Sequence, residues 1–242
     1  MSSRSRASIL RRLREALNNT DRLFREDRVA LSDMLVTVAP VEGDAEKLAE
    51  HFGANLKEVS GTYEIVTDAI EVAGRVTARI RDWLPESREE PIEVLSWAPI
   101  ELSIEALESQ LRDAGVVLVA PPDLHDEQIR LQTATLDVGI TSVDAAFAGT
   151  GSILLAAGPG KSRAAALLPL HHIALIPFSR IYPTLEAWMR SLRQRGELET
   201  FLRKNGQVAF ITGPSKTADI ELTLTLGVHG PKQIHAIIFD DA

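Results

Sequence analysis

The chain has 242 residues, of which 45% are hydrophobic and 25% are charged, a composition typical of a globular protein. None is cysteine, which excludes disulfides, thiolate catalysis, cysteine-ligated zinc and cysteine-bound iron–sulfur clusters from these residues. No apolar run reaches the roughly 20 residues of a membrane span, and the arginine-rich start lacks the apolar core of a secretory signal. We therefore expect a cytoplasmic protein.

Charge divides the sequence into a basic arm and an acidic body. The net charge of −8 argues against general nucleic-acid binding. Residues 1–28 carry eight Arg and four acidic side chains, a charge of +4, so the rest of the chain carries −12. One face of the first expected helix is apolar, formed by Ile9, Leu10, Leu13 and Leu17. This pattern predicts a helix that docks on the body or on a partner.

The expected domain organisation is an amino-terminal helical arm, residues 1–38, followed by an α/β domain, residues 39–242. The arm contains a second expected helix, Leu23–Leu35. Periodicity in the domain predicts helices at Ala45–Phe52, Ile65–Trp83, Glu105–Arg112, Glu127–Leu136 and Thr184–Lys204. It predicts strands at Leu56–Val59, Ile92–Leu95, Val116–Ala120, Gly139–Thr141, Ser152–Ala157, His172–Pro177, Gln207–Thr212 and Gln233–Phe239.

Several of these strands are apolar at consecutive positions, which is typical of central parallel strands covered on both faces. The sequence therefore predicts a three-layer α/β/α body with a mostly parallel sheet. The long helix Thr184–Lys204 is expected to cover one face of that sheet.

The last third of the chain reads as strand, polar turn, helix, second turn and strand, over Ile211–Phe239. The expected helix start contains Ser215, Thr217 and Asp219. Their side chains can cap the backbone N–H groups that have no partner within the helix, and the same N–H groups can instead bind an anion. A right-handed crossover would place Gly213–Thr217 at the carboxyl end of a parallel strand, where ligands of open α/β sheets bind. The alternative is a turn followed by an ordinary helix cap.

Two further glycine-containing turns precede this block. Thr150, Gly151 and Ser152, where an apolar strand begins, form either a contact surface for a carboxylate or phosphate or a simple turn. Residues 158–162, Gly-Pro-Gly-Lys-Ser, imitate the end of a phosphate-binding P-loop. Leu155 occupies the position where that motif needs its first glycine, so nucleoside triphosphate hydrolysis is disfavoured.

The histidines lack the helical spacing of a metal site, and no metal is expected. His171 and His172 are strand neighbours that face opposite ways, so one of them is expected to be structural. His229, between glycines at a strand start, is the better functional candidate. A hydrolase triad of Ser152 or Ser215 with His229 and Asp219 is disfavoured because no Gly-x-Ser-x-Gly elbow presents the serine.

Four segments in order resemble the LUD-domain family, in particular its lactate utilization protein C branch. They are Gly139–Ala148, Thr150–Leu154, Leu168–Pro177 and Ile211–Phe239, and the resemblance is strong over residues 95–242. It implies the fold of the sugar-phosphate isomerase and coenzyme A transferase superfamily. It also implies a role in oxidising L-lactate to pyruvate beside two sister proteins that carry iron–sulfur clusters, with no cofactor in this chain.

Gly149 departs from the family pattern, since many members have glutamate before Thr-Gly-Thr. The look-alike transferases use a glutamate as covalent nucleophile, so the resemblance does not carry that chemistry to this chain.

Two hypotheses follow from the sequence. The first is an accessory or substrate-handling subunit of an iron–sulfur lactate oxidation complex. The second is a stand-alone binding protein or isomerase- or transferase-like enzyme for a small phosphorylated or carboxylated metabolite. Its catalytic candidates are His229, Lys216 and Asp219, and its ligand-binding candidates are Thr150, Gly151, Ser152, Gly213, Pro214, Ser215, Thr217, His229 and Gly230.

Overall fold

The computed structural model describes residues 3–18, 41–84, 91–121, 126–218 and 224–241. The chain divides into two units, Met1–Thr37 and Val38–Ala242, and each is described by itself. In the first unit, α1 (Ser3–Asn18) is an amphipathic helix whose apolar Ile9, Leu10 and Leu13 are exposed. The second helix expected in the arm, Leu23–Leu35, lies outside the described residues.

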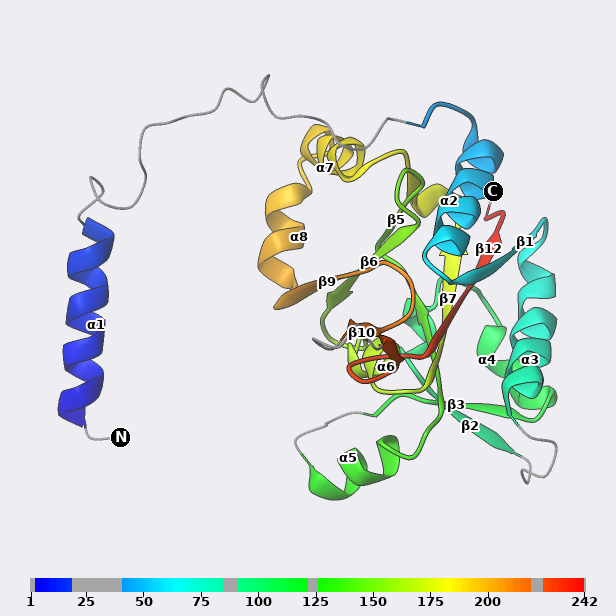
Figure 1. Cartoon of the computed structure of the whole chain (residues 1–242), viewed down its shortest axis with the longest axis horizontal. Coiled ribbons are helices and arrows are strands. Elements are labelled where there is room, and N and C mark those ends of the chain that lie inside the picture. The colour runs from blue at the N-terminus through cyan, green and yellow to red at the C-terminus, as the bar shows by residue number, and fades with distance from the viewer. Residues whose placement is uncertain (1–2, 19–40, 85–90, 122–125, 219–223, 242) are drawn as a thin grey trace. The chain divides into compact units, whose positions relative to one another are not determined.

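The second unit is built on a six-stranded sheet in which every pairing is parallel (Figure 1). Its spatial order is β1, β12, β7, β4, β2, β3. The strands are β1 (Thr62–Val66), β2 (Ile92–Ser96), β3 (Val116–Val119), β4 (Val138–Ser142), β7 (His171–Pro177) and β12 (Gln233–Phe239). The central strands β4, β7 and β12 are almost wholly buried, which explains their continuous apolar runs.

Helices cover both faces of this sheet, so the expected three-layer α/β/α architecture with a mostly parallel sheet is confirmed. One face packs against α3 (Val72–Trp83), whose Trp83 ring stacks on His171 with centroids 4.8 Å apart. The opposite face packs against α6 (Ala164–Leu167), which approaches Gly139. The remaining helices of the sheet layers are α2 (Ala45–Glu58), α4 (Leu107–Asp113) and α5 (Glu127–Thr133).

A second sheet of four strands stands beside the first, in the order β8, β5, β6, β9. Its strands are β5 (Ala145–Phe147), β6 (Ser152–Ala157), β8 (Ile181–Tyr182) and β9 (Gln207–Ile211). Ala146, Ile153 and Leu155 pack into the main core, whereas Phe147 and Leu154 on the other face pack against Trp188 and Leu192. The last two residues belong to α7 (Leu185–Gln194), which is followed by α8 (Leu198–Lys204).

Three expected elements are wrong in extent or type. Leu56–Val59 is not a strand, because α2 runs to Glu58 and buries Leu48, Phe52 and Leu56 on one helical face. The helix expected over Ile65–Trp83 begins only at Val72, after β1 and a 3₁₀ turn. Thr184–Lys204 is two helices, since Gly196 adopts φ +70° and ends α7, and both helices cover the second sheet instead of the first.

The helix expected after Gly213 is also wrong. Lys216–Ala218 is strand β10, which pairs antiparallel with β11 (Leu224–Leu226). The hydroxyls near Ser215 imitate a helix cap, but the backbone N–H of Gly227 donates to the Ser215 carbonyl and extends this antiparallel pairing. In addition, β9 pairs antiparallel with β6, so Gly213–Thr217 does not follow a parallel strand of the main sheet.

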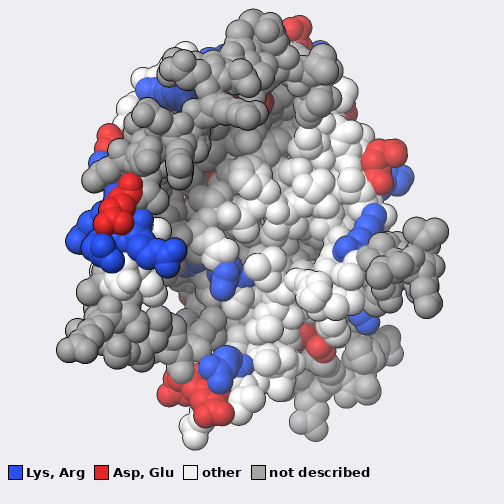
Figure 2. Space-filling model, turned by 60° about the vertical axis from the view of Figure 1, so that its left-hand side comes forward, with Lys and Arg blue, Asp and Glu red and all other residues white. Residues whose placement is uncertain are grey.

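Within the described ranges, no helix combines the length and apolar character needed to cross a bilayer. On the face seen in Figure 2, uncharged side chains predominate, and most of the acidic groups lie toward its margins.

Candidate functional site

The turns that the sequence singled out do meet in space. We call residues 149–152, 212–217 and 227–231 the loop cluster. Ser152 Oγ lies 2.7 Å from Thr212 Oγ1, which joins the first turn to the second. The backbone N–H of Ser215 donates to the Pro231 carbonyl, and the N–H of His229 donates to Ser215 Oγ at 3.4 Å, which joins the second turn to the third.

Two glycines of these turns, Gly151 and Gly213, are explained by the approach of α2. Gly151 adopts φ +63°, and a Cβ there would lie 2.3 Å from the backbone N of Leu56. Gly213 adopts φ +77°, and a Cβ there would lie 2.6 Å from the Val59 carbonyl oxygen. Only glycine tolerates such contacts in this conformation. Packing against the carboxyl end of α2 therefore accounts for both glycines without a ligand.

The other candidates of the loop cluster have mixed surroundings. Lys216 Nζ donates to Ser60 Oγ at 2.9 Å, which ties this lysine to the residues after α2. His229 is exposed, and its backbone N–H, not its ring, hydrogen-bonds Ser215 Oγ. Pro214 is buried, Thr217 and Gly230 are half-buried, and Asp219 lies outside the described residues. Ligand binding by this cluster stays a prediction.

A small pocket does open at the first turn. It has a volume of about 260 Å³ and is lined by Phe147, Thr150, Ser152, Pro183, Thr184, Leu185, Glu186, Phe210 and Thr212. Phe147 and Phe210 stack with centroids 6.1 Å apart. Glu186 stands at the rim, where hydrogen bonds from its own backbone and Thr184 lower the pKa of its carboxyl. Apart from the Ser152–Thr212 pair, the pocket is mostly apolar.

A larger pocket, the sheet-edge pocket, lies at the carboxyl ends of β2 and β3. Strands β2 and β4 are neighbours in the sheet. The strand that follows β2 in sequence, β3, lies on one side of this pair, and the next strand of the sheet after β4, β7, lies on the other side. This reversal is the topological switch point, where open α/β sheets bind ligands. The pocket has a volume of about 770 Å³ and is lined by Ser96, Ala98, Ala120, Pro121, Ala157, Gly158, Pro159, Gly160, Lys161, Ser162, Arg163, Gly206 and Gln207.

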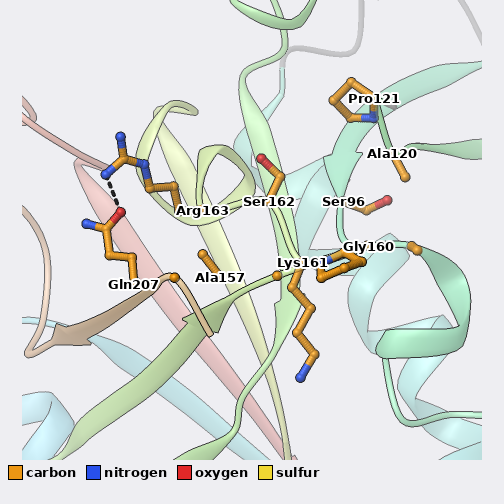
Figure 3. A pocket seen from close by; sticks show the side chains of 13 residues that line it. Ser96, Ala120, Pro121, Ala157, Gly160, Lys161, Ser162, Arg163 and Gln207 are labelled. Atoms are coloured by element: carbon orange, nitrogen blue, oxygen red, sulfur yellow. Dashed lines mark hydrogen bonds between the residues drawn. The ribbon is translucent and has the colours of Figure 1, made fainter. Parts of the chain in front are cut away.

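The segment that imitates a P-loop forms one wall of this pocket (Figure 3). Pro159 and Gly160 make a tight turn, closed by paired hydrogen bonds between Gly158 and Lys161, with Gly160 at φ +73°. Arg163 Nη1 donates to the side-chain oxygen of Gln207 at 2.5 Å. Figure 3 shows this pair on one side of the pocket and Ser96, Ala120 and Gly160 on the other.

Lys161 belongs to a polar network under the pocket. Its ammonium donates to Asp144 Oδ1 at 2.8 Å, lies 3.6 Å from Glu101 Oε2 and stands over the Trp97 ring at 5.0 Å. Asp144 also accepts the backbone N–H of Ala156 at 2.7 Å, which fixes its carboxylate. The charge of Lys161 is therefore neutralised within the protein, and in Figure 3 its side chain points away from Arg163.

Two buried histidines lie toward the opposite, amino-terminal edge of the sheet. Burial lowers the pKa of His172 to about 3, and its Nε2 lies 2.9 Å from Thr141 Oγ1. Burial also lowers the pKa of His235, although its hydrogen bond to Glu64 at 2.9 Å acts the other way. His171 faces Trp83 on the side opposite His172, as alternation predicts, and burial lowers its pKa too. The lowered pKa values favour the neutral form of all three rings.

Comparison with known proteins identifies the family. The model of the LUD domain matches residues 44–239. The chain belongs to the LUD domain family. The expected resemblance to this family is thereby confirmed.

Among related sequences, the LUD chain is 43% identical over 105 residues to lactate utilization protein C of Exiguobacterium sp., which covers 43% of this chain and 45% of that one. It is 38% identical over 119 residues to lactate utilization protein C of Halalkalibacterium halodurans. This match covers 48% of this chain and 51% of the relative. These matches thus span about half the length of the relatives. A DUF162 family protein from Deinococcus radiodurans shares the fold, with a TM-score of 0.55, 18% identity and coverage of 82% and 99%.

Sequence reasoning missed the pocket residues Ser96 and Gln207 of this LUD chain, and it considered Lys161 only as part of a failed P-loop. The signal for Ser96 is its place at the end of an apolar strand, Ile92–Ser96. Ser96 is 1% exposed, yet its Oγ has no hydrogen-bond partner in the described structure.

Proposed function

We propose that this LUD chain is a cytoplasmic, non-redox component of lactate utilization that handles a ligand beside iron–sulfur partners, which oxidise L-lactate to pyruvate. The observation that carries the proposal is the similarity to proteins named lactate utilization protein C, at 31–43% identity. The family match over residues 44–239 supports it.

The composition supports a non-redox role for these residues. Cysteine thiolates hold most iron–sulfur clusters, and the chain has none. The electron-transfer step of the proposed reaction therefore falls to partner proteins. The sheet-edge pocket supports ligand handling, because it lies where α/β sheets bind small molecules and its volume falls in the usual range for such sites.

Helix α1 offers a docking element for such a partner. Its Ile9, Leu10 and Leu13 are exposed, and Arg11, Arg12 and Arg14 stand beside them. A helix with an apolar stripe and flanking basic side chains suits a partner groove that is apolar inside and acidic at its rim. The apolar side chains would fill the groove, and the arginines would pair with the acidic rim.

A second candidate function, a stand-alone binding protein for a small phosphorylated or carboxylated metabolite, is favoured by the pocket at Thr150 and Ser152. The paired hydroxyls of Ser152 and Thr212 form its polar end. In this case the chain would act without iron–sulfur partners.

Deleting the gene is expected to impair growth on L-lactate while leaving growth on glucose unchanged, because only the lactate pathway would lose a component. Growth curves of the parent, the deletion strain and the deletion strain carrying a plasmid copy measure this. The plasmid copy controls for effects on neighbouring genes. Normal growth and normal lactate oxidation in the deletion strain, without a duplicate gene, would rule the proposal out.

A further inference from the structure

The sheet-edge pocket contains a buried hydroxyl for which no described residue provides a hydrogen-bond partner. Ser96 is 1% exposed and lines the pocket, and its Oγ has no hydrogen-bond partner within the described structure. Leaving such a group unpaired in a core is unfavourable, and most buried polar atoms find a partner. A ligand that donates to or accepts from this hydroxyl would satisfy it.

The charges that line the pocket are both positive. They are Lys161 and Arg163, and no acidic side chain is among the lining residues that the structure describes. Lys161 is neutralised by Asp144 and by the more distant Glu101. Arg163 hydrogen-bonds the neutral amide of Gln207, and no ion pair to it is found among the described residues. The guanidinium therefore offers its charge to an anion in the pocket.

The rest of the lining is small and mostly apolar, provided by Ala98, Ala120, Pro121, Ala157 and Pro159. Walls of this kind pack against the carbon skeleton of a ligand, while a few polar groups fix its orientation. Figure 3 shows the polar groups on two sides, with Ser96 beside Ala120 and Gly160 on one side and Arg163 with Gln207 on the other. A ligand that reaches both sides needs a polar group at each end.

The volume of the sheet-edge pocket indicates a ligand larger than lactate. A cavity of about 150 Å³ holds benzene, a molecule of six non-hydrogen atoms like lactate. The sheet-edge pocket, at about 770 Å³, is roughly five times larger. Lactate alone would leave most of it to water.

We infer that the sheet-edge pocket binds an organic anion larger than lactate, with its carboxylate or phosphate at Arg163 and a second polar group at Ser96. Both groups of the ligand remain unchanged on binding, so no bond is made or broken. This inference does not depend on the proposed role in lactate utilization.

The test is isothermal titration calorimetry of the full chain with four anions. Gluconate and adenosine 5′-monophosphate are the larger carboxylate and phosphate, and L-lactate and inorganic phosphate are the small counterparts. We expect at least one larger anion to bind at least tenfold more tightly than both small ones. Tight binding of gluconate alone identifies a carboxylate ligand, and tight binding of the nucleotide alone identifies a phosphate ligand.

Two variants locate the binding. Arg163→Gln is expected to weaken it by about 10- to 100-fold, the effect of losing a charge-assisted hydrogen bond, and Arg190→Gln, on the exposed side of α7, is the matched control. Ser96→Ala is expected to weaken binding about three- to tenfold while keeping or raising the melting temperature, because it removes an unpaired buried hydroxyl. A merely structural serine would instead lose stability.

The inference is overturned if neither larger anion binds more tightly than the small ones, or if Arg163→Gln and Ser96→Ala bind them as the parent does. The growth experiment is independent of this result. Normal growth of the deletion strain on lactate with tight anion binding would reject the lactate role and leave the pocket inference intact.

Discussion

Replacing Gly139 with alanine is expected to lower the free energy of unfolding by about 3–5 kcal/mol or to prevent folding, because the core cannot accept the added methyl group. A Cβ at this position would lie 1.8 Å from the Ala165 carbonyl oxygen and 3.0 Å from Pro169 Cγ. The nearest obstacle is backbone, so it cannot move aside as a flexible side chain would. Relief requires α6 to shift away from β4, which loosens the wall of the sheet-edge pocket.

Urea denaturation followed by circular dichroism measures this effect. Gly74→Ala is the matched control, because Gly74 lies inside α3 and, apart from its chain neighbours and the nearby backbone of its own helix, no described atom lies within 4 Å of the place that the added methyl group would take. Alanine favours helix over glycine, so the control is expected to gain about 0.5–1 kcal/mol. A Gly139→Ala protein within about 1 kcal/mol of the parent would contradict the close contact between β4 and α6.

Acid is expected to destabilise the protein through its buried histidines, with His172 the largest single contributor. Burial lowers the pKa of His172 from 6.5 to about 3 in the folded chain. Between these pH values the unfolded chain binds a proton at this site and the folded chain does not, so stability falls as pH falls. The His172 site contributes a slope of about 1.4 kcal/mol per pH unit in this range. The lowered pKa values of His171 and His235 act in the same direction.

The variant His172→Gln isolates this contribution, since glutamine cannot ionise and its amide can still hydrogen-bond Thr141. Denaturation midpoints at pH 7.5, 6.0 and 5.0 should give a dependence on pH that is flatter than the parent's by about one proton, or about 1.4 kcal/mol per unit. His51→Gln, on the exposed side of α2, controls for loss of a histidine. Equal slopes for the parent and His172→Gln would show that His172 is not held neutral by burial.

Much of the fold could be predicted from local pattern, because buried parallel strands leave long apolar runs. The strands β6, β7, β9 and β12 are found at their expected positions within one residue. The strands β5 and β8 have only three and two residues, too few for any period to show. The pairing of β10 and β11 could not be recognised from the sequence, because serine and threonine occur in turns as well as at helix caps.

The candidate site was harder to predict, because the role of each residue depends on contacts with residues distant in the sequence. Gly151 and Gly213 read as ligand turns, yet the structure places each against the end of α2, a contact no local pattern reveals. Conversely, Ser96 has the sequence context of an ordinary strand residue, and only its lack of a hydrogen-bond partner among the described residues distinguishes it. Lys161 stood out only as part of a segment that imitates a P-loop, and its partner Asp144 could not be identified from the sequence.

The proposed role in lactate utilization is tested most directly by isolating the tagged protein from cells grown on L-lactate, with an untagged strain as control. The proteins that co-purify are identified by mass spectrometry, and the isolate is assayed for conversion of L-lactate to pyruvate. We predict that cysteine-rich iron–sulfur proteins co-purify and that the isolate oxidises L-lactate. A chain that is recovered alone and without this activity would contradict the proposal and favour a stand-alone binding protein.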